Sequence, residues 1–100
     1  MFLKLCDLNT LIPDEPRSFR IKDQEIMVIC HDRAFYCLDA RCTHAGAPLA
    51  EGILEKQVLT CPWHYSQFDI TTGSVLRGPA KRPLKAYQKE IQDDFLFVNI

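Results

Sequence analysis

Several features that would indicate common protein classes are missing from this 100-residue sequence. Lysine and arginine total 12 against 13 aspartate and glutamate, so the basic excess of a nucleic-acid-binding protein is absent. No apolar run approaches the roughly 20 residues that span a bilayer, and the N-terminal segment lacks the apolar core of a signal peptide. We therefore expect one soluble, cytoplasmic domain with neither a nucleic-acid nor a membrane partner.

Helical periodicity is also lacking, because no segment repeats its apolar positions every 3.6 residues for longer than about two turns. Strand-forming residues instead recur at roughly ten-residue spacing, which predicts an all-β sandwich or small barrel. The sequence SFRIKDQEIMVIC predicts two strands joined near Asp23, and QFDITTGSVL predicts a hairpin with Gly73 at its turn. Further strands are expected in HDRAFYCLDA, in KQVLTC and around Asp93 in the C-terminal segment.

The five cysteines do not suit a closed disulfide framework, since their number is odd and the expected compartment is reducing. Cys6, Cys30 and Cys37 fall in apolar, strand-like runs, where we expect them to act as small buried hydrophobic residues. Cys42 and Cys61 differ from these three because each stands next to a histidine at the spacing of metal ligands.

The two pairs read C-x-H and C-x-x-H: Cys42 with His44, and Cys61 with His64. Two thiolates and two imidazoles suit either a tetrahedral zinc ion or an iron–sulfur cluster. Zinc fits less well, because zinc fingers group cysteine with cysteine and histidine with histidine, whereas each pair here supplies one of each. A zinc-bound interaction module stays open as an alternative. A nucleophile–base pair of Cys61 and His64 is disfavoured, because no orienting acid is apparent.

The segments CTHAGAPLAEG and CPWHYSQFDITTG resemble the two ligand boxes of Rieske [2Fe–2S] proteins, and GPAKRPLKAYQ resembles their proline loop. The resemblance covers nearly the whole chain and is strongest to the small ferredoxin components of bacterial ring-hydroxylating dioxygenases. It implies a Rieske-type antiparallel β-sandwich forming a single domain over residues 1–100. A small cluster-binding lobe, formed by two loops, is expected at about residues 40–80.

The same resemblance implies one [2Fe–2S] cluster, with Cys42 and Cys61 on one iron and His44 and His64 on the other. Replacing two thiolates by neutral imidazoles makes the cluster less negative and therefore easier to reduce. Rieske potentials accordingly fall at roughly −150 to +300 mV, against about −400 mV for plant-type ferredoxins.

Residues around the ligands are expected to support the cluster. Gly46 would let loop N–H groups approach the sulfur atoms, and Pro79 would stiffen the proline loop. Ser66 stands where the respiratory branch of the family has a serine that donates a hydrogen bond to cluster sulfur. Phe68 stands where that branch has a tyrosine, so one of two donors is missing. This implies a potential in the lower half of the range, roughly −150 to 0 mV.

Ala47 and Trp63 stand where respiratory Rieske proteins have cysteines that form a disulfide, so no such bridge is expected here. With Ala45 and Leu49, these two residues are expected to form an apolar collar around the histidine edges. Such a collar would be a small, weak docking face, typical of electron-transfer encounters.

The resemblance implies an electron carrier that is not itself an enzyme. The chain would pass single electrons from a ferredoxin reductase to a terminal oxygenase by transient docking. It has three histidines, too few to add the mononuclear iron site of an oxygenase to the cluster ligands. The alternative is the Rieske small subunit of an NADH-dependent nitrite reductase.

Outside the ligand boxes, we expect the remaining histidine and three basic residues to lie at the surface, exposed to solvent. His31 lies at a predicted turn. Lys81, Arg82 and Lys85 lie near the proline loop, where steering of an acidic partner is the alternative interpretation.

Overall fold

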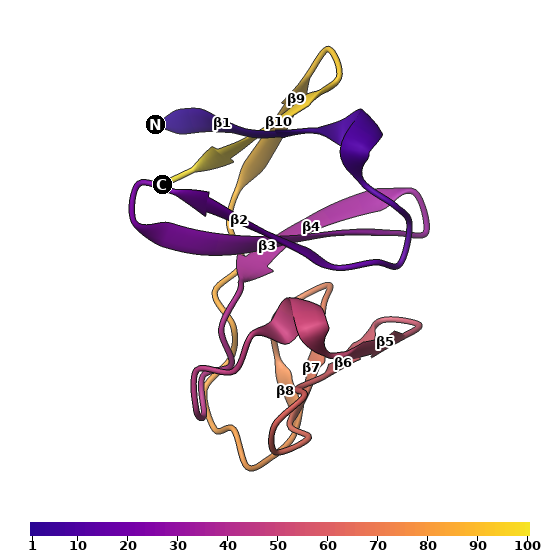
Figure 1. Ribbon diagram of the computed structural model, residues 1–100, viewed down its shortest axis with the longest axis vertical. Helices are drawn as coiled ribbons and strands as arrows, with labels where there is room; N and C mark the ends of the chain where they lie inside the picture. The colour runs from indigo at the N-terminus through magenta and orange to yellow at the C-terminus, as the bar shows by residue number, and fades with distance from the viewer.

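The computed structural model describes all residues 1–100 and consists of strands and two short 3₁₀ helices (Figure 1). The predicted all-β, antiparallel fold is confirmed, and no helix is long and apolar enough to cross a membrane. The strands are β1 (Phe2–Asp7), β2 (Arg17–Ile21), β3 (Gln24–His31), β4 (Ala34–Asp39), β5 (Ile53–Glu55), β6 (Val58–Thr60), β7 (Gln67–Asp69), β8 (Val75–Arg77), β9 (Lys89–Gln92) and β10 (Phe95–Asn99), and the 3₁₀ helices are η1 (Leu8–Thr10) and η2 (Leu49–Glu51).

Two three-stranded sheets, ordered β1-β10-β9 and β2-β3-β4, form the base of the molecule in the upper part of Figure 1. A third sheet, β5-β6-β7-β8, forms a smaller lobe below them. Each sheet is antiparallel throughout, because its neighbouring strands are paired antiparallel. The base is assembled from both ends of the chain, whereas the lobe comes from its middle.

Strand β3 joins the two parts because it is buried on both faces. Side chains alternate along a strand, so Ile26 and Val28 point to one side and Met27 and Ile29 to the other. Ile26 and Val28 belong to the core of the base, whereas Met27 and Ile29 belong to the core of the lobe. All four are fully buried, and this continuous apolar run fixes the lobe against the base.

The predicted turns lie where the sequence places them. Lys22 and Asp23 connect β2 to β3, Asp32 and Arg33 connect β3 to β4, and all four have positive φ. Two-residue hairpin loops of this kind match the right-handed twist of the flanking strands. Gly73 also has a positive φ, of 84°, in the turn before β8.

Two minor predictions need correction. Cys6 and Cys37 are buried as expected, but Cys30 is only partly buried. The His31 side chain is 22% exposed, and its Nδ1 lies 2.6 Å from the Asp14 carboxylate, so it is not a freely solvated residue. His31 ends β3, and Asp14 reaches it because the Asp14 backbone N–H donates to the Cys30 carbonyl.

Asp39 ties the end of β4 to the segment that follows the proline loop. Its carboxylate accepts hydrogen bonds from the Lys85 backbone N–H and the Tyr87 hydroxyl, both at 2.8 Å. Burial, together with the hydrogen bond to Asp39, raises the pKa of Tyr87 to about 12, above its usual value near 10.

The raised pKa of Tyr87 predicts a fall in stability at alkaline pH. Between about pH 10 and pH 12 the folded state keeps the phenolic proton that the unfolded state has lost, so stability decreases as pH rises. Denaturant unfolding from pH 9 upwards measures this slope. We expect Tyr87→Phe to reduce this slope. Burial also raises the pKa of Cys37 to about 12, but Cys37 contributes the same slope to both proteins and so does not affect the comparison. Equal slopes for the two proteins would contradict the assignment.

Candidate metal centre

The first ligand loop begins where β4 ends and closes on itself through two backbone hydrogen bonds. The Gly46 N–H donates to the Cys42 carbonyl at 2.8 Å, and the Cys42 N–H donates to the Ala47 carbonyl at 2.9 Å. Gly46 has a φ of 72°, the left-handed conformation that glycine adopts most easily. This closure leaves Cys42 only 4% exposed at the foot of the loop, whereas His44 is exposed at its tip.

The second loop repeats this arrangement after β6. The Cys61 N–H donates to the Ser66 carbonyl at 2.8 Å, and Tyr65 has a φ of 64°. Cys61 is 2% exposed, whereas His64 is exposed. Each loop therefore holds its cysteine inside the lobe and presents its histidine at the surface.

The fold brings like donors together in pairs. The His44 and His64 rings lie with centroids 5.1 Å apart and planes at 81°. The Cys61 side chain lies beside the Cys42 thiol. Burial and, to a smaller extent, Cys61 raise the pKa of the Cys42 thiol, whereas the backbone N–H groups of His44 and Ala45 point toward its sulfur and lower it. This supports the prediction that loop N–H groups face the sulfur atoms.

These pairs fit a two-iron cluster. Each iron of such a cluster takes two protein ligands, which matches one thiol pair and one imidazole pair. A tetrahedral zinc ion needs four donors around a single point. No three histidine, cysteine, aspartate or glutamate side chains of the chain converge on one point. The two-and-two grouping is the chemical feature that a [2Fe–2S] cluster requires.

A third segment, residues 78–83, lies beside both loops at the lower end of the molecule (Figure 1). The Ala80 N–H donates to the buried Ser66 hydroxyl oxygen at 2.9 Å, and the Thr43 hydroxyl donates to the Arg82 carbonyl at 2.6 Å. One hydrogen bond thus ties the segment to each loop. Pro79 is exposed here and lines a cleft beside His44.

The Rieske [2Fe–2S] domain matches residues 1–88 of the sequence. The chain belongs to the Rieske [2Fe–2S] domain family. The predicted resemblance is thereby confirmed, and the cofactor of the family is a [2Fe–2S] cluster.

Curated Rieske relatives include ferredoxin components of dioxygenases. The ferredoxin component of biphenyl 2,3-dioxygenase from Rhodococcus jostii is 30% identical over 97 residues, covering 97% of this chain and 91% of the relative. The 3-phenylpropionate/cinnamic acid dioxygenase ferredoxin subunit from Photorhabdus laumondii is 34% identical over 77 residues, covering 76% and 73%. Human apoptosis-inducing factor 3 is 28% identical over 94 residues, or 94% of this chain, which spans only 16% of that longer protein.

Solved structures give the same family. The ferredoxin of Sphingomonas yanoikuyae B1 superimposes with a TM-score of 0.93 at 28% identity, covering 100% of this chain and 99% of the other. A chain of the complex of reduced oxygenase and oxidised ferredoxin in carbazole 1,9a-dioxygenase gives 0.87 at 30% identity, covering 97% and 91%. A nitrite reductase NADPH small subunit gives 0.83 over 100% and 99%, but at 18% identity it shows the fold alone.

The collar predicted around the Rieske histidines is partly wrong. Ala47 and Leu49 are fully buried in the core of the lobe, because the loop closure turns them inward. Ala45 is exposed, Trp63 is 52% exposed, and Tyr65, which the sequence analysis did not single out, is 65% exposed. The signal for Tyr65 was its place next to His64 in a tight loop.

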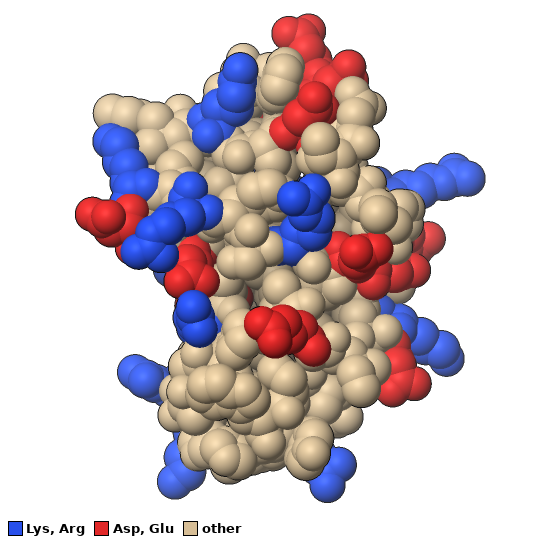
Figure 2. All heavy atoms as spheres, in the orientation of Figure 1, with Lys and Arg blue, Asp and Glu red and all other residues tan.

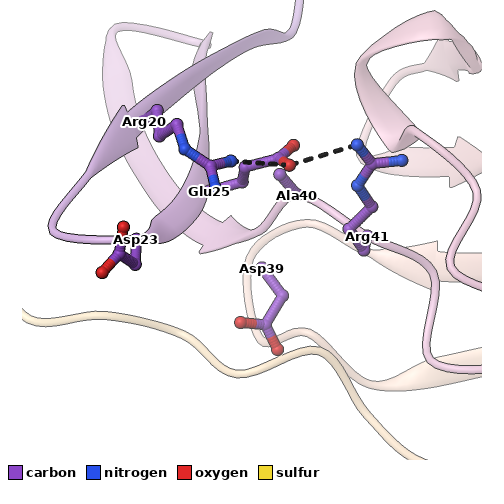
Figure 3. Close-up of a pocket in the computed structure, with 6 residues that line it drawn as sticks. All are labelled: Arg20, Asp23, Glu25, Asp39, Ala40 and Arg41. Carbon is purple, nitrogen blue, oxygen red and sulfur yellow. Dashed lines mark hydrogen bonds and ion pairs between the residues drawn. The ribbon is translucent and has the colours of Figure 1, made fainter.

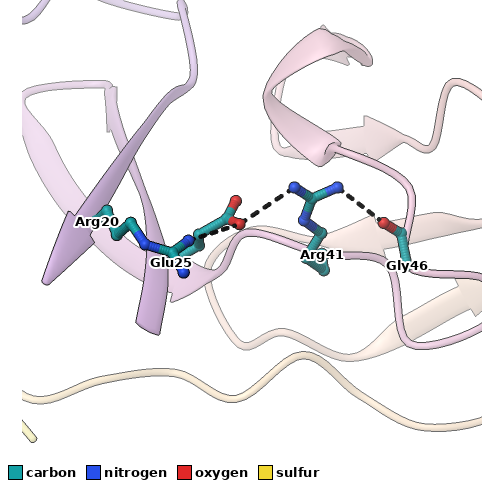
Figure 4. A network of polar contacts seen from close by, with 4 residues as sticks. All are labelled: Arg20, Glu25, Arg41 and Gly46. Atoms are coloured by element: carbon teal, nitrogen blue, oxygen red, sulfur yellow. Dashed lines mark hydrogen bonds and ion pairs between the residues drawn. The ribbon is translucent and has the colours of Figure 1, made fainter. Parts of the chain in front are cut away.

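Sequence reasoning also missed an arginine that links the first Rieske loop to the base (Figure 4). Arg41 donates through Nη1 to the Gly46 carbonyl at 3.2 Å and through Nη2 to Glu25 at 3.1 Å, and Arg20 binds the same carboxylate. These groups border a groove of about 360 Å³, shown in Figure 3. The groove is lined by Arg20, Asp23, Glu25, Asp39, Ala40 and Arg41. Exposed ion pairs of this kind contribute little stability, but the double contact of Arg41 orients the loop.

Ser66 offers a measurable test of the second loop. Ser66→Ala removes the acceptor of the buried Ala80 N–H, which we expect to lower the free energy of unfolding by about 1–3 kcal/mol. The Ser66 hydroxyl donates to no group of the chain, so we expect its proton to be available to cluster sulfur and the reduction potential of the loaded variant to fall as well. Denaturant unfolding and redox titration measure the two effects.

Ser18→Ala is the matched control for Ser66→Ala. Ser18 is exposed in β2, so the control should change stability by less than about 0.5 kcal/mol and leave the potential unaltered. An unchanged potential in Ser66→Ala would show that its hydroxyl does not reach the cluster.

Proposed function

We propose that this Rieske chain carries single electrons from a reductase to a terminal oxygenase of a ring-hydroxylating system. One observation carries the proposal: two buried thiols lie together beneath two neighbouring imidazoles that are exposed at the tip of the lobe. A redox centre held in this way is shielded from water on one side and open to a partner on the other.

In the proposed centre, Cys42 and Cys61 would hold one iron and His44 and His64 would hold the other. When bound, the [2Fe–2S] cluster supplies a one-electron couple at a potential that its imidazole ligands raise. The exposed imidazole edges bring the partner close to the centre. The loop closures and the two hydrogen bonds to residues 78–83 keep the four ligands in place, which reduces the rearrangement that a change of charge demands. The lobe at about residues 40–80 and the base together form one Rieske domain over residues 1–100.

The relatives support the choice of partners. Two of comparable length are named as the ferredoxin subunit or component of a dioxygenase, and one similar chain comes from a complex of an oxygenase with its ferredoxin. We assign the reductase as electron donor because an electron carrier needs one. We also propose a cytoplasmic location, which suits five cysteines with no disulfide among them. The nitrite reductase alternative rests on the fold alone and is not favoured.

Electron paramagnetic resonance after dithionite reduction, with iron and sulfide counted on the same sample, tests the proposal. We expect two irons and two sulfides per chain and the signal of a reduced Rieske cluster. A colourless protein that contains zinc and gives no signal would overturn the carrier function. Co-purification in a fixed complex with a large catalytic subunit would favour the nitrite reductase alternative.

A further inference from the structure

The charges of this chain are divided unevenly between its two ends. Residues 40–85, which include the lobe and the proline loop, hold six lysines and arginines against three acidic residues, a net charge of +3. The remaining residues hold six against ten, a net charge of −4. Figure 2 shows the lower end largely uncharged, with basic side chains projecting at its margins, and more acidic side chains higher up. The formal net charge of −1 is therefore the sum of a positive end and a negative end.

Two of the cations at the positive end are unpaired and stand beside a proposed ligand. Lys81 and Arg82 are exposed, and neither side chain makes an ion pair or a hydrogen bond within the chain. By contrast, Arg20 and Arg41 share Glu25. Lys81 and Arg82 line a cleft of about 420 Å³ together with Thr43, His44 and Pro79. An open cleft thus holds two free positive charges and one of the two exposed imidazoles.

We propose that this cleft receives a carboxylate from an acidic docking face of the redox partner, next to the electron exit at His44. The inference rests on the proposed carrier function and specifies the chemistry of the partner. Guanidinium and ammonium groups are the protein donors best suited to carboxylates. Trp63 and Tyr65, both more than half exposed, flank His64 in the sequence, and the His64 ring lies 5.1 Å from that of His44, so these two side chains are the ones we assign to the apolar part of the contact.

The uneven charge also selects one orientation of approach. The electron on a reduced cluster removes one unit of positive charge from residues 40–85, so that this end keeps a net charge near +2. An acidic partner is then attracted to the lobe and repelled by the base, whose charge is −4. Charges separated by more than about 10 Å are screened at 0.1 M salt, so the attraction guides the last part of the encounter. Salt should therefore weaken association.

Redox ions of opposite charge test the local potential without a partner protein. The cluster-loaded protein is reduced with dithionite, freed of excess dithionite, and mixed with ferricyanide, a trivalent anion, or hexaamminecobalt(III), a trivalent cation, over a series of salt concentrations. The net charge of the reduced protein, the formal −1 plus the added electron, is negative and predicts that oxidation by ferricyanide accelerates as salt rises, whereas the proposed cleft predicts the opposite. We expect the ferricyanide rate constant to fall roughly tenfold from low salt to about 0.3 M, and the cobalt rate constant to rise. A peptide of six glutamates should inhibit the ferricyanide reaction at low salt.

Two variants with equal net charge locate the effect. Lys81→Gln/Arg82→Gln removes two positive charges from the cleft, and Lys22→Gln/Arg33→Gln removes two from exposed turns of the base. We expect the first pair to abolish the salt dependence with ferricyanide and the inhibition by the peptide, and the second to leave both unchanged.

The inference is overturned if the ferricyanide rate rises with salt, if both double variants respond alike, or if the glutamate peptide has no effect. A sample that shows no reduced-cluster signal before mixing would instead count against the proposed carrier function.

Discussion

Cys61→Ala is expected to abolish cluster binding, lowering the iron content from two per chain to none. Cys61 is one of only two thiols at the proposed centre, and its loss leaves one iron with a single protein ligand at the buried end of the lobe. Iron and sulfide analysis with the visible absorption spectrum of the purified variant measures the loss. A Cys61→Ala protein that retains two irons and the Rieske spectrum would refute the ligand assignment.

Cys37→Ala is the matched control, because Cys37 is an equally buried cysteine that lies in the core of the base. Burial raises the pKa of the Cys37 thiol to about 12, and the thiol packs in the core of the base, outside the lobe that holds the four proposed ligands. The control should keep two irons per chain. Loss of iron from a folded Cys37→Ala protein would show that the assay reports damage to the fold instead of loss of a ligand.

Gly73→Ala is expected to lower the free energy of unfolding by about 3 kcal/mol. Gly73 has a φ of 84°, and a Cβ atom at this position would lie 2.3 Å from the Leu84 carbonyl oxygen. That oxygen cannot withdraw easily, because the Leu84 N–H donates to the Gly73 carbonyl at 2.8 Å and fixes the two segments together. Denaturant unfolding of the cluster-loaded protein measures the loss.

Gly46→Ala separates the conformational cost of a positive φ from the steric overlap with the Leu84 carbonyl, the two causes of the loss expected at Gly73. Gly46 has a similar φ of 72°, but a Cβ atom there would have no neighbour within 4 Å. Its substitution should cost only the conformational penalty, about 1–2 kcal/mol. If the two variants lose the same stability, the overlap with Leu84 is relieved by a small backbone shift and the larger prediction for Gly73 is wrong.

The positions of the strands were predictable because the signals for them, strand-forming residue types and the turn residues between them, are local in the sequence. The turn at Asp23 and the positive φ of Gly73 follow from residue types that tolerate left-handed backbone. Strand β3 shows the limit of this reasoning. Its run of apolar residues from Ile26 to Ile29 predicts a buried strand, but only the packing of the lobe against the base explains why both faces are covered.

The tertiary structure decided what surrounds the four proposed ligands. Ala47 was expected at the surface, but the closure of the first loop buries it. Ser66 accepts its hydrogen bond from Ala80, and Arg41 reaches Glu25, across 14 and 16 residues of sequence. Neither contact belongs to a local motif, so no spacing in the sequence predicts it.

The sequence by itself determined the fold class, the family and the identity of the proposed ligands. A cysteine and a histidine at short spacing in each of two loops indicate metal ligands, whatever the sequence of the rest of the chain. Only the tertiary structure decided that the two thiols lie together inside the lobe, with the imidazoles of His44 and His64 outside. It also decided that the positive charges of Lys81 and Arg82 share a cleft with His44. The physical reason is that burial and electric field depend on distances in space, which the chain sets only when its distant segments pack together.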